Sequence, residues 1–254
     1  MKARLRSAAA ASPLGRRALT LLRPASRDVW AMRRRLARRY LRGEGLEVGA
    51  LHEPLPVRRG VRVRYVDRHS VDQLRRHYPE LRDRQLVPVD VIDDGETLAT
   101  VPDASVDFVV ANHFLEHTQD PIGTLGHHLR VLRHGGILFL AVPDKRRTFD
   151  AGRPVTPLEH LVRDHAEGPA WSRRGHFQVW AALVEGVAPE AVAERARELE
   201  GYDYSIHFHV WTPTAFTALL AHAAAEERLP LAVETLQSAR YEFVAVLRKD
   251  GQGS

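Results

Sequence analysis

The sequence predicts an α/β domain with a doubly wound, mostly parallel sheet, a C-terminal antiparallel hairpin and a helical lid insertion. Three observations carry this prediction. Apolar runs alternate with helical patterns between residues 44 and 143. Two of these runs, 106–112 and 136–143, are almost continuously apolar, as strands covered on both faces are. A chain of 254 residues with 44% hydrophobic content can also bury one substantial core.

The individual elements follow from local patterns. The expected strands of the first half are GLEVG (45–49), VRVRYVD (61–67), VDFVVAN (106–112) and GILFLAVP (136–143). Helical periodicity covers 71–81 and 120–136, and the second helix should end in a glycine pair that suits a left-handed cap. Near the C-terminus we expect a helix over 212–228 and then two hairpin strands, LAVETLQ and YEFVAVLRK.

Residues 144–210 interrupt the alternation of strands and helices. This segment is long, polar and rich in His and Arg, and it contains a helical stretch at 189–202. Ligands of doubly wound folds bind outside the carboxyl ends of the strands. We therefore expect residues 144–210, called the lid below, to cover that end of the sheet.

The net charge of +5 is distributed unevenly. Residues 1–43 hold 13 Lys and Arg against Asp28, a net charge of +12, which leaves −7 on residues 44–254. Val29, Met32, Leu36 and Tyr40 recur at helical spacing between the arginines, so 1–43 is predicted to be a basic helical arm. It could attract anionic lipid, nucleic acid or a phosphorylated substrate. We favour the alternative that the arm packs against the acidic residues 44–254 and keeps its arginines solvated.

Several classes of protein and site are disfavoured by composition. No apolar run approaches the roughly 20 residues that a membrane-spanning helix needs. The chain has no Cys, which excludes disulfides, thiolate metal sites and a cysteine nucleophile. We expect a soluble, cytoplasmic protein, with peripheral membrane contact by the arm as an alternative; the oligomeric state stays open.

Four motifs occur in order between residues 44 and 144. They are Glu47 and Gly49 in the first loop, Asp67 ending the second strand, and Asp90 in VPVDVIDD, followed by DASVDFVVANHFLEHTQDP and LRVLRHGGILFLAVPD. This order resembles the class I S-adenosylmethionine-dependent methyltransferases, in particular the small-molecule, methyltransferase type 11-like group. The resemblance implies a Rossmann-like methyltransferase domain over 44–254 with S-adenosylmethionine as its cofactor.

The resemblance also implies which residues hold the cofactor. Asp67 lies 20 positions beyond Glu47, where a carboxylate binds a ribose diol in dinucleotide folds; otherwise it merely ends a strand. Glu47 and Gly49 would lie near the methionine and ribose portions. Asp90 and Val91 would hold the adenine, although a surface loop of acids is the alternative and Asp93 and Asp94 stay open. The remaining expected cofactor contacts are Ala50, Arg68, Asn112 and His117.

The first loop departs from the family pattern because it reads Gly49, Ala50, Leu51, His52, with a single glycine. Extra glycines let a backbone approach a pyrophosphate, which S-adenosylmethionine lacks. Only residues 50–60 separate this loop from the next strand, and Pro54 and Pro56 interrupt them. We expect an irregular connection instead of a helix there, which also argues against a nicotinamide or flavin cofactor.

A hydroxyl acceptor must lose a proton to a base or a metal-bound group during methyl transfer. The candidates for the catalytic site are His113, Asp144, His160, His207 and His209. Sequence alone leaves the choice of base open, and polar side chains of a solvated insertion are the alternative for each. His113 and His117 are four apart but do not match the zinc motif H-E-x-x-H. Asp144 could orient a histidine or, with a second acid, hold Mg²⁺.

Aromatic and arginine side chains of the lid suit a saccharide or glycosylated natural product as the acceptor, or alternatively an ordinary apolar core. The aromatic residues are Trp171, Phe177, Trp180, Tyr202, Tyr204 and Trp211. We expect an O-methyltransferase of a small or medium polar molecule. A non-catalytic module of the same fold is one alternative. A nucleic-acid methyltransferase is less favoured, since residues 112–115 read Asn-His-Phe-Leu instead of an Asn/Asp-Pro-Pro-aromatic motif.

Overall fold

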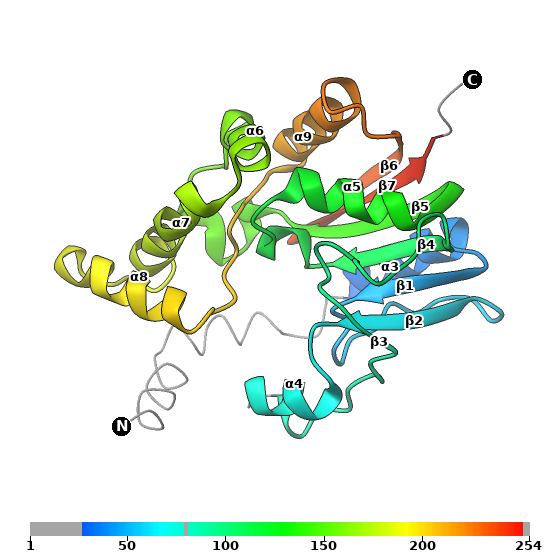
Figure 1. Ribbon diagram of the computed structural model, residues 1–254, viewed down its shortest axis with the longest axis horizontal. Helices are drawn as coiled ribbons and strands as arrows, with labels where there is room; N and C mark the ends of the chain where they lie inside the picture. Colours follow the sequence, from blue (N-terminus) through cyan, green and yellow to red (C-terminus); the bar gives the residue numbers. More distant parts are fainter. Residues whose placement is uncertain (1–26, 79–80, 251–254) are drawn as a thin grey trace.

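A seven-stranded mixed sheet organises the computed structural model, which describes residues 27–78 and 81–250 (Figure 1). The strand order is β3-β2-β1-β4-β5-β7-β6. Strands β1 to β5 pair in parallel, whereas β7 is antiparallel to both β5 and β6. The predicted fold class and the C-terminal hairpin are confirmed. The strands are β1 (Glu44–Val48), β2 (Arg62–Asp67), β3 (Val91–Ile92), β4 (Val106–Asn112), β5 (Leu132–Pro143), β6 (Leu231–Ala239) and β7 (Glu242–Lys249).

Helices cover both faces of this sheet, and α6, α7 and α8 of the lid lie beyond the carboxyl ends of its parallel strands (Figure 1). Helices α5 and α9 share one apolar core with the sheet, and α3 packs on the opposite face. The helices are α3 (Arg27–Tyr40), α4 (Val71–His77), α5 (Pro121–Val131), α6 (Leu158–Glu167), α7 (Ala170–Leu183), α8 (Val192–Gly201) and α9 (Pro213–Ala225). In the described ranges, no helix combines the length and apolarity required to cross a membrane.

Strand β4 shows why its central residues, 108–111, are all apolar. Val109 and Ala111 belong to the core on the α5 and α9 face, while Phe108 and Val110 belong to the core under α3. Alternate side chains of a strand point to opposite faces. Where both faces are buried, as at residues 108–111, every side chain is therefore apolar.

Two of the differences from the predicted element boundaries have a clear local cause. Helix α5 ends at Val131 and β5 begins at Leu132, so Gly135 and Gly136 lie inside a strand; the predicted glycine cap is wrong. The pair coincides with a register shift between β4 and β5, and Gly135 has a φ of +74°. Helix α4 ends at His77 because Tyr78 precedes a proline, which disfavours helical backbone.

The irregular connection between β1 and β2 is confirmed. Residues 50–60 form two turns and irregular backbone with no helix, and Leu51 has a φ of +50°. The connection is anchored by Leu55, whose side chain is buried under α3 and whose backbone N–H donates to Glu47.

The basic arm forms helix α3 where the structure describes it, and its first 26 residues lie outside the described ranges. Val29, Met32 and Leu36 are buried against the sheet, which confirms the expected packing. Arg33 is also buried and forms a bidentate ion pair with Glu242 at the start of β7. The expectation that the arm's arginines are solvated is therefore wrong for Arg33.

Candidate cofactor and acceptor site

A cavity of about 410 Å³ opens beyond the carboxyl ends of β1, β2 and β4. Its sheet-side wall includes Gly49 after β1, Asp67 and Arg68 at the end of β2, and His113 and His117 after β4. Three consecutive residues after β3, Asp94 to Glu96, belong to the same wall. The opposite wall belongs to the lid and comprises Arg173, Asp203, Tyr204, Ser205 and Phe208.

Asp67 presents a partly buried carboxylate at the end of β2. Its Oδ1 accepts a hydrogen bond of 3.2 Å from the backbone N–H of His69. Burial raises the pKa of Asp67, although that hydrogen bond and nearby cationic groups oppose the shift. The remaining acceptor capacity of this carboxylate is available to a diol in the cavity.

Two glycines shape the cofactor side of the cavity. Gly49 has a φ of +64°, and a Cβ added there would find only Phe114, at 3.8 Å. Gly95 is different because its Cβ would overlap Val48 and Phe114 at 2.5 and 2.7 Å. The backbone can therefore approach a ligand closely at Gly49, and Gly95 is required by the packing behind it.

Glu47 is turned away from the cavity. Both of its carboxylate oxygens accept from the Leu55 backbone N–H, at 2.9 and 3.1 Å, and Asn112 Nδ2 donates at 3.4 Å. Burial raises the pKa of Glu47 to about 7, against the effect of these donors. Glu47 and Asn112 do not line the cavity, and their contacts fasten the 50–60 connection to the sheet.

Asp94 occupies the position in the cavity wall that the sequence suggested for Asp90. Asp90 is exposed, and its Oδ2 accepts a 2.8 Å hydrogen bond from the Tyr65 backbone, outside the cavity. Val91 packs against the core, and Ala50 lines only a small hollow beside β2. The acidic residues of VIDDGE are the sequence signal that could have indicated Asp94 and Glu96. Asp90 faces away from the cavity because its backbone and side chain pair with Tyr65 of β2.

Glu96 carries the most perturbed carboxyl group of the cavity wall. Burial and the adjacent Asp94 raise the pKa of Glu96 to about 7, although the Gln119 backbone N–H partly opposes this. Its charge therefore changes near neutral pH. The sequence prediction contained no role for this residue.

His113 is held by two acidic side chains. Its Nε2 lies 2.8 Å from Glu242 Oε2, and its Nδ1 lies 3.3 Å from Glu116 Oε1. Burial disfavours the charged ring, but the hydrogen bonds to Glu116 and Glu242 outweigh it and raise the pKa of His113 to about 9. The role of His113 as a base stays a prediction; its two acidic partners favour the protonated ring, which has no free electron pair.

His117 has the opposite electrostatic environment. Burial and the nearby His207 lower the pKa of His117 to about 4, so its ring is neutral at pH 7. Nδ1 donates to the Ile206 carbonyl at 2.8 Å and lies 3.1 Å from Ser205 Oγ. This tautomer leaves the lone pair on Nε2.

Asp144, expected near the acceptor, does not line the cavity. Its carboxylate accepts two hydrogen bonds from the Arg146 side chain, at 2.9 and 2.6 Å, and a third from the Arg146 backbone. These contacts lower the pKa of Asp144. A carboxylate paired in this way with a guanidinium does not offer the oxygen ligands that Mg²⁺ needs.

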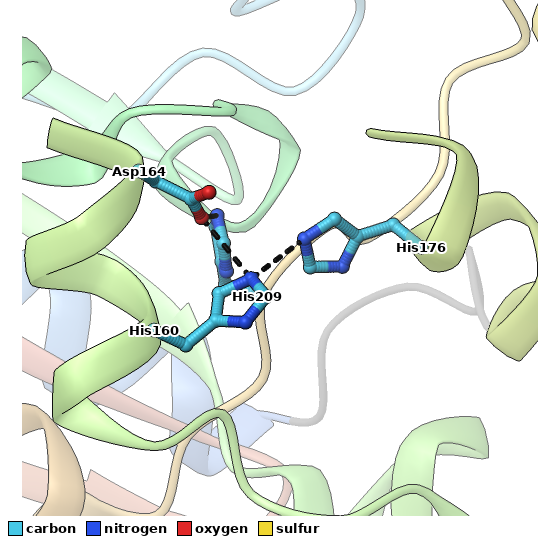
Figure 2. Close-up of side chains that lie close together, drawn as sticks. All are labelled: His160, Asp164, His176 and His209. Atoms are coloured by element: carbon cyan, nitrogen blue, oxygen red, sulfur yellow. Dashed lines mark hydrogen bonds and ion pairs between the residues drawn. The ribbon is translucent and has the colours of Figure 1, made fainter. Parts of the chain in front are cut away.

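The other predicted histidines divide into two groups outside the cavity wall. His207 Nδ1 lies 2.7 Å from Asp150 Oδ2, and its ring packs edge-on against His117. His160 and His209 instead meet His176 and Asp164 elsewhere in the lid (Figure 2). Among the lid aromatics, Tyr204 lines the cavity, whereas Phe177 and Trp180 belong to the lid's own core.

Comparison with known proteins identifies the family. Residues 33–224 match the family model described as a methyltransferase domain. The chain belongs to this family. This chain is also similar to a probable S-adenosylmethionine-dependent methyltransferase of Mycolicibacterium smegmatis, with 36% identity over 103 residues. That alignment covers 40% of this chain and only 37% of the relative's length.

Two solved structures illustrate the similarity of this chain to known folds, at low sequence identity. A S-adenosylmethionine-dependent methyltransferase from Aquifex aeolicus is 13% identical, with coverage of 83% of this chain and 84% of that chain and a TM-score of 0.45. A Rhodobacter sphaeroides protein, named as a candidate zinc-dependent alcohol dehydrogenase, is 15% identical, with coverage of 90% and 92% and a TM-score of 0.52.

The residues of the cavity fit the cofactor that this family implies. Asp67 offers a carboxylate to ribose hydroxyls, Gly49 allows close approach of the backbone, and Asp94 adds an acceptor for an amino group. No helix N-terminus from 50–60 faces the cavity, which matters little for a cofactor without a pyrophosphate. A volume of about 410 Å³ lies within the range of small-molecule sites.

Proposed function

We propose that this methyltransferase transfers a methyl group from S-adenosylmethionine to a hydroxyl of a small or medium polar acceptor, with a saccharide or a glycosylated product as the favoured class. One observation carries the proposal: a single cavity has a carboxylate-bearing wall at the strand ends and a polar, partly aromatic wall from the lid. A neutral His117 imidazole lies in that same cavity.

The donor would bind at the sheet-side wall. Asp67 would accept from the ribose hydroxyls, Gly49 would lie along the methionine portion, and Asp94 with Glu96 would lie at the adenine. S-adenosylmethionine supplies the electrophilic methyl group. The contribution of the protein is mainly alignment, since well-oriented reactants reach effective molarities of about 10⁵ M or more.

The acceptor would bind against the lid wall. Arg173 donates to Asp203 at 2.8 Å, and its guanidinium lies 5.8 Å from the centre of the Phe208 ring. Polar groups beside a flat apolar ring suit a sugar, whose edges are polar and whose faces are apolar. Arg68 of the sheet-side wall and Asp203 of the lid wall form an ion pair of 3.4 Å, which extends this polar surface.

His117 is the proposed base. Its Nε2 would accept the proton of the acceptor hydroxyl while Nδ1 stays hydrogen-bonded to Ile206. A neutral ring at pH 7 is competent to accept a proton, unlike the His113 imidazolium.

Incubation of the protein with methyl-labelled S-adenosylmethionine and a panel of free and glycosylated hydroxyl compounds, followed by mass spectrometry, tests the proposal. We expect transfer to a hydroxyl oxygen and at least about a 100-fold loss of kcat in His117→Gln, since general bases contribute roughly that much. Calorimetry with S-adenosylhomocysteine is the accompanying binding measurement. Binding without transfer to any acceptor would favour the non-catalytic alternative, and methylation at nitrogen or carbon would refute the oxygen assignment.

A further inference from the structure

Four side chains of the lid converge away from the cavity (Figure 2). His160 and Asp164 are one turn apart on α6, His176 lies on α7, and His209 lies in the segment that returns toward α9. One imidazole nitrogen of each histidine and one oxygen of Asp164 all lie within 4.8 Å of one another. We call these four residues the lid histidine cluster.

The distances within the lid histidine cluster resemble those between ligands of a tetrahedral metal ion. His160 Nε2 lies 3.1 Å from His176 Nε2 and 3.1 Å from Asp164 Oδ2, and His209 Nε2 lies 3.7 Å from the same oxygen. Metal–ligand bonds of 2.0–2.1 Å in a tetrahedron place neighbouring ligand atoms about 3.3–3.4 Å apart. The three separations scatter around that value.

Hydrogen bonding among the four residues leaves buried atoms unsatisfied. Asp164 is fully buried, and no described residue donates a hydrogen bond to its Oδ2; the contact with His160 lacks hydrogen-bond geometry. His209 is also fully buried, and its Nδ1 has no hydrogen-bond partner among the described residues. An unsatisfied buried carboxylate oxygen is costly, and a cation at this point would satisfy it.

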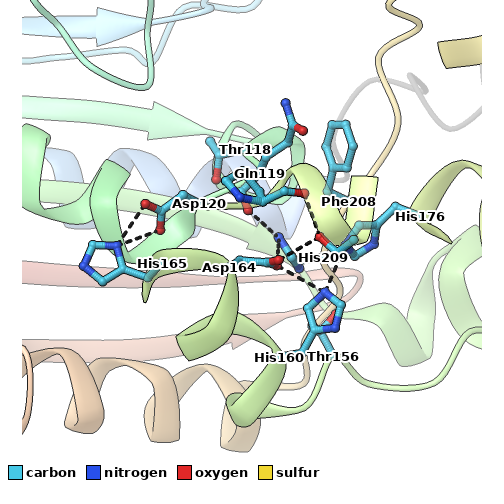
Figure 3. Close-up of polar contacts among 12 residues, drawn as sticks. Thr118, Gln119, Asp120, Thr156, His160, Asp164, His165, His176, Phe208 and His209 are labelled. Carbon is cyan, nitrogen blue, oxygen red and sulfur yellow. Dashed lines mark hydrogen bonds and ion pairs between the residues drawn. The ribbon is translucent and has the colours of Figure 1, made fainter. Parts of the chain in front are cut away.

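Surrounding groups orient the ligands (Figure 3). Ser172 Oγ donates to Asp164 Oδ1 at 2.7 Å, which leaves Oδ2 facing the histidines. Such an outer contact is typical of a metal ligand. The Gln119 carbonyl lies 3.2 Å from His209 Nε2, so without a metal this nitrogen donates to Gln119, and metal binding through Nε2 would move the proton to the unpaired Nδ1. Burial, with nearby imidazoles, lowers the pKa of His176 to about 3 and the pKa of His209 well below its usual value, so both rings are neutral.

We propose that the lid histidine cluster binds one divalent transition-metal ion, with Zn²⁺ as the natural probe. Three imidazoles and a carboxylate, with no thiolate in the chain, are ligands that Zn²⁺ accepts. The four protein ligands complete a tetrahedron, and none of them lines the cavity. The site is therefore structural: the metal ties α6, α7 and the 203–210 segment together.

A metal bound by the lid histidine cluster would hold the lid wall of the cavity in a fixed position. Arg173 lies between Ser172 and His176 on α7, and Phe208 precedes His209, so the metal's ligands adjoin residues that face the acceptor side. A separate group, Glu116, His117 and His207, also brings three donor atoms together, but it includes the cavity residue His117 and offers one ligand fewer.

The test uses the full chain, stripped with a chelator and titrated with ZnCl₂ in a calorimeter, with metal content read by elemental mass spectrometry. We expect one Zn²⁺ per chain. The double variant His160→Gln/His176→Gln should bind Zn²⁺ at least about 100-fold more weakly, more than the loss of an outer contact causes. His165→Gln is the matched control because His165 lies on the same helix and pairs instead with Asp120.

A thermal melt separates loss of the site from loss of the fold. Zn²⁺ should raise the melting temperature of the wild type and of His165→Gln but not that of the double variant, whose metal-free melt should match the stripped wild type. Equal Zn²⁺ affinity in the double variant and the wild type, no binding by the wild type, or loss of the metal on His207→Gln alone would overturn the proposal. Because none of these measurements involves methyl transfer, they are independent of the proposed activity.

Discussion

His113 and Glu242 are joined by a 2.8 Å contact although 129 residues separate them in the sequence. Glu242 simultaneously pairs with Arg33 of α3, and His113 pairs with Glu116 on its other side. Charges therefore alternate from α3 through β7 to the cavity wall. This row of ion pairs connects the face covered by α3 to the loop that follows β4.

Replacement of Glu242 by Gln should destabilise the protein, because Glu242 is the carboxylate that Arg33 and His113 share. Arg33, which is buried, and His113, which is partly exposed, would each lose a carboxylate partner, so we expect a decrease of about 3–5 kcal/mol in the free energy of unfolding, mainly from the unpaired Arg33. Urea unfolding at pH 7 measures it. Glu234→Gln is the control: Glu234 pairs with Arg248 in a more exposed position, and its loss should cost less than about 1 kcal/mol. If Glu242→Gln and Glu234→Gln lowered the free energy of unfolding equally, the stabilising role of Glu242 would be refuted.

The raised pKa of His113 predicts a pH dependence of stability. The folded state binds this proton more tightly than the unfolded chain, with a pKa of about 9 against an ordinary value of 6.5. The stabilisation is therefore complete below pH 6.5 and is lost as the pH rises through about 9. The difference in unfolding free energy between wild type and His113→Gln should shrink over that interval; a constant difference would show that His113 is neutral in the fold.

Asp67 should dominate donor affinity. Asp67→Asn removes a charge that would accept from two hydroxyls, and charge-assisted hydrogen bonds contribute about 1.5–3 kcal/mol. We expect S-adenosylhomocysteine to bind about 10- to 100-fold more weakly in a calorimeter. Asp72→Asn, on the exposed surface of α4, should leave the affinity unchanged. Unaltered binding in Asp67→Asn would remove Asp67 from the donor site.

Glu96 should make donor binding depend on pH. Its pKa of about 7 means that a negative charge develops on the cavity wall between about pH 6 and 8. An ionised carboxylate attracts the cationic sulfonium and accepts better from an amino group, so S-adenosylmethionine should bind more tightly as the pH rises. The expected step disappears in Glu96→Gln. A step that persists in this variant would point to another titrating group.

Gly49 should be sensitive to a single added methyl group. Gly49→Ala would place a side chain on backbone with a φ of +64°, which costs about 1–2 kcal/mol, and the methyl group would intrude toward the donor. We expect both a lower melting temperature and weaker binding of S-adenosylhomocysteine. Gly152→Ala is the control because its Cβ meets nothing within 4 Å and its φ is not positive. Wild-type affinity in Gly49→Ala would show that the donor does not pass this turn.

The sequence predicts the fold well because each element carries a local signal. The nearly continuous apolar run of β4 correctly predicts a strand that is buried on both faces. The prolines after Gly49 correctly predict that no helix connects β1 and β2. The glycine pair at 135–136 gave a wrong prediction of a helix cap, because a helix cap and an irregular strand can both place a glycine at positive φ, as at Gly135.

The candidate site is predicted less completely because it depends on contacts between distant residues. Asp67 follows from its place at the end of a strand. The state of His113, in contrast, depends on Glu242 in the last strand, and no spacing in the sequence reveals that pairing. Likewise, the choice between Asp90 and Asp94 depends on which backbone group of β2 is paired, and that is a property of the assembled sheet.

The pairing of Arg33 with Glu242 across 209 positions also bears on biosynthesis. The strand that neutralises the buried guanidinium of α3 is synthesised only after more than 200 further residues. During that interval the helix has no partner for Arg33, and the nascent sheet has no β7. Completion of this face therefore waits until β7 has emerged from the ribosome.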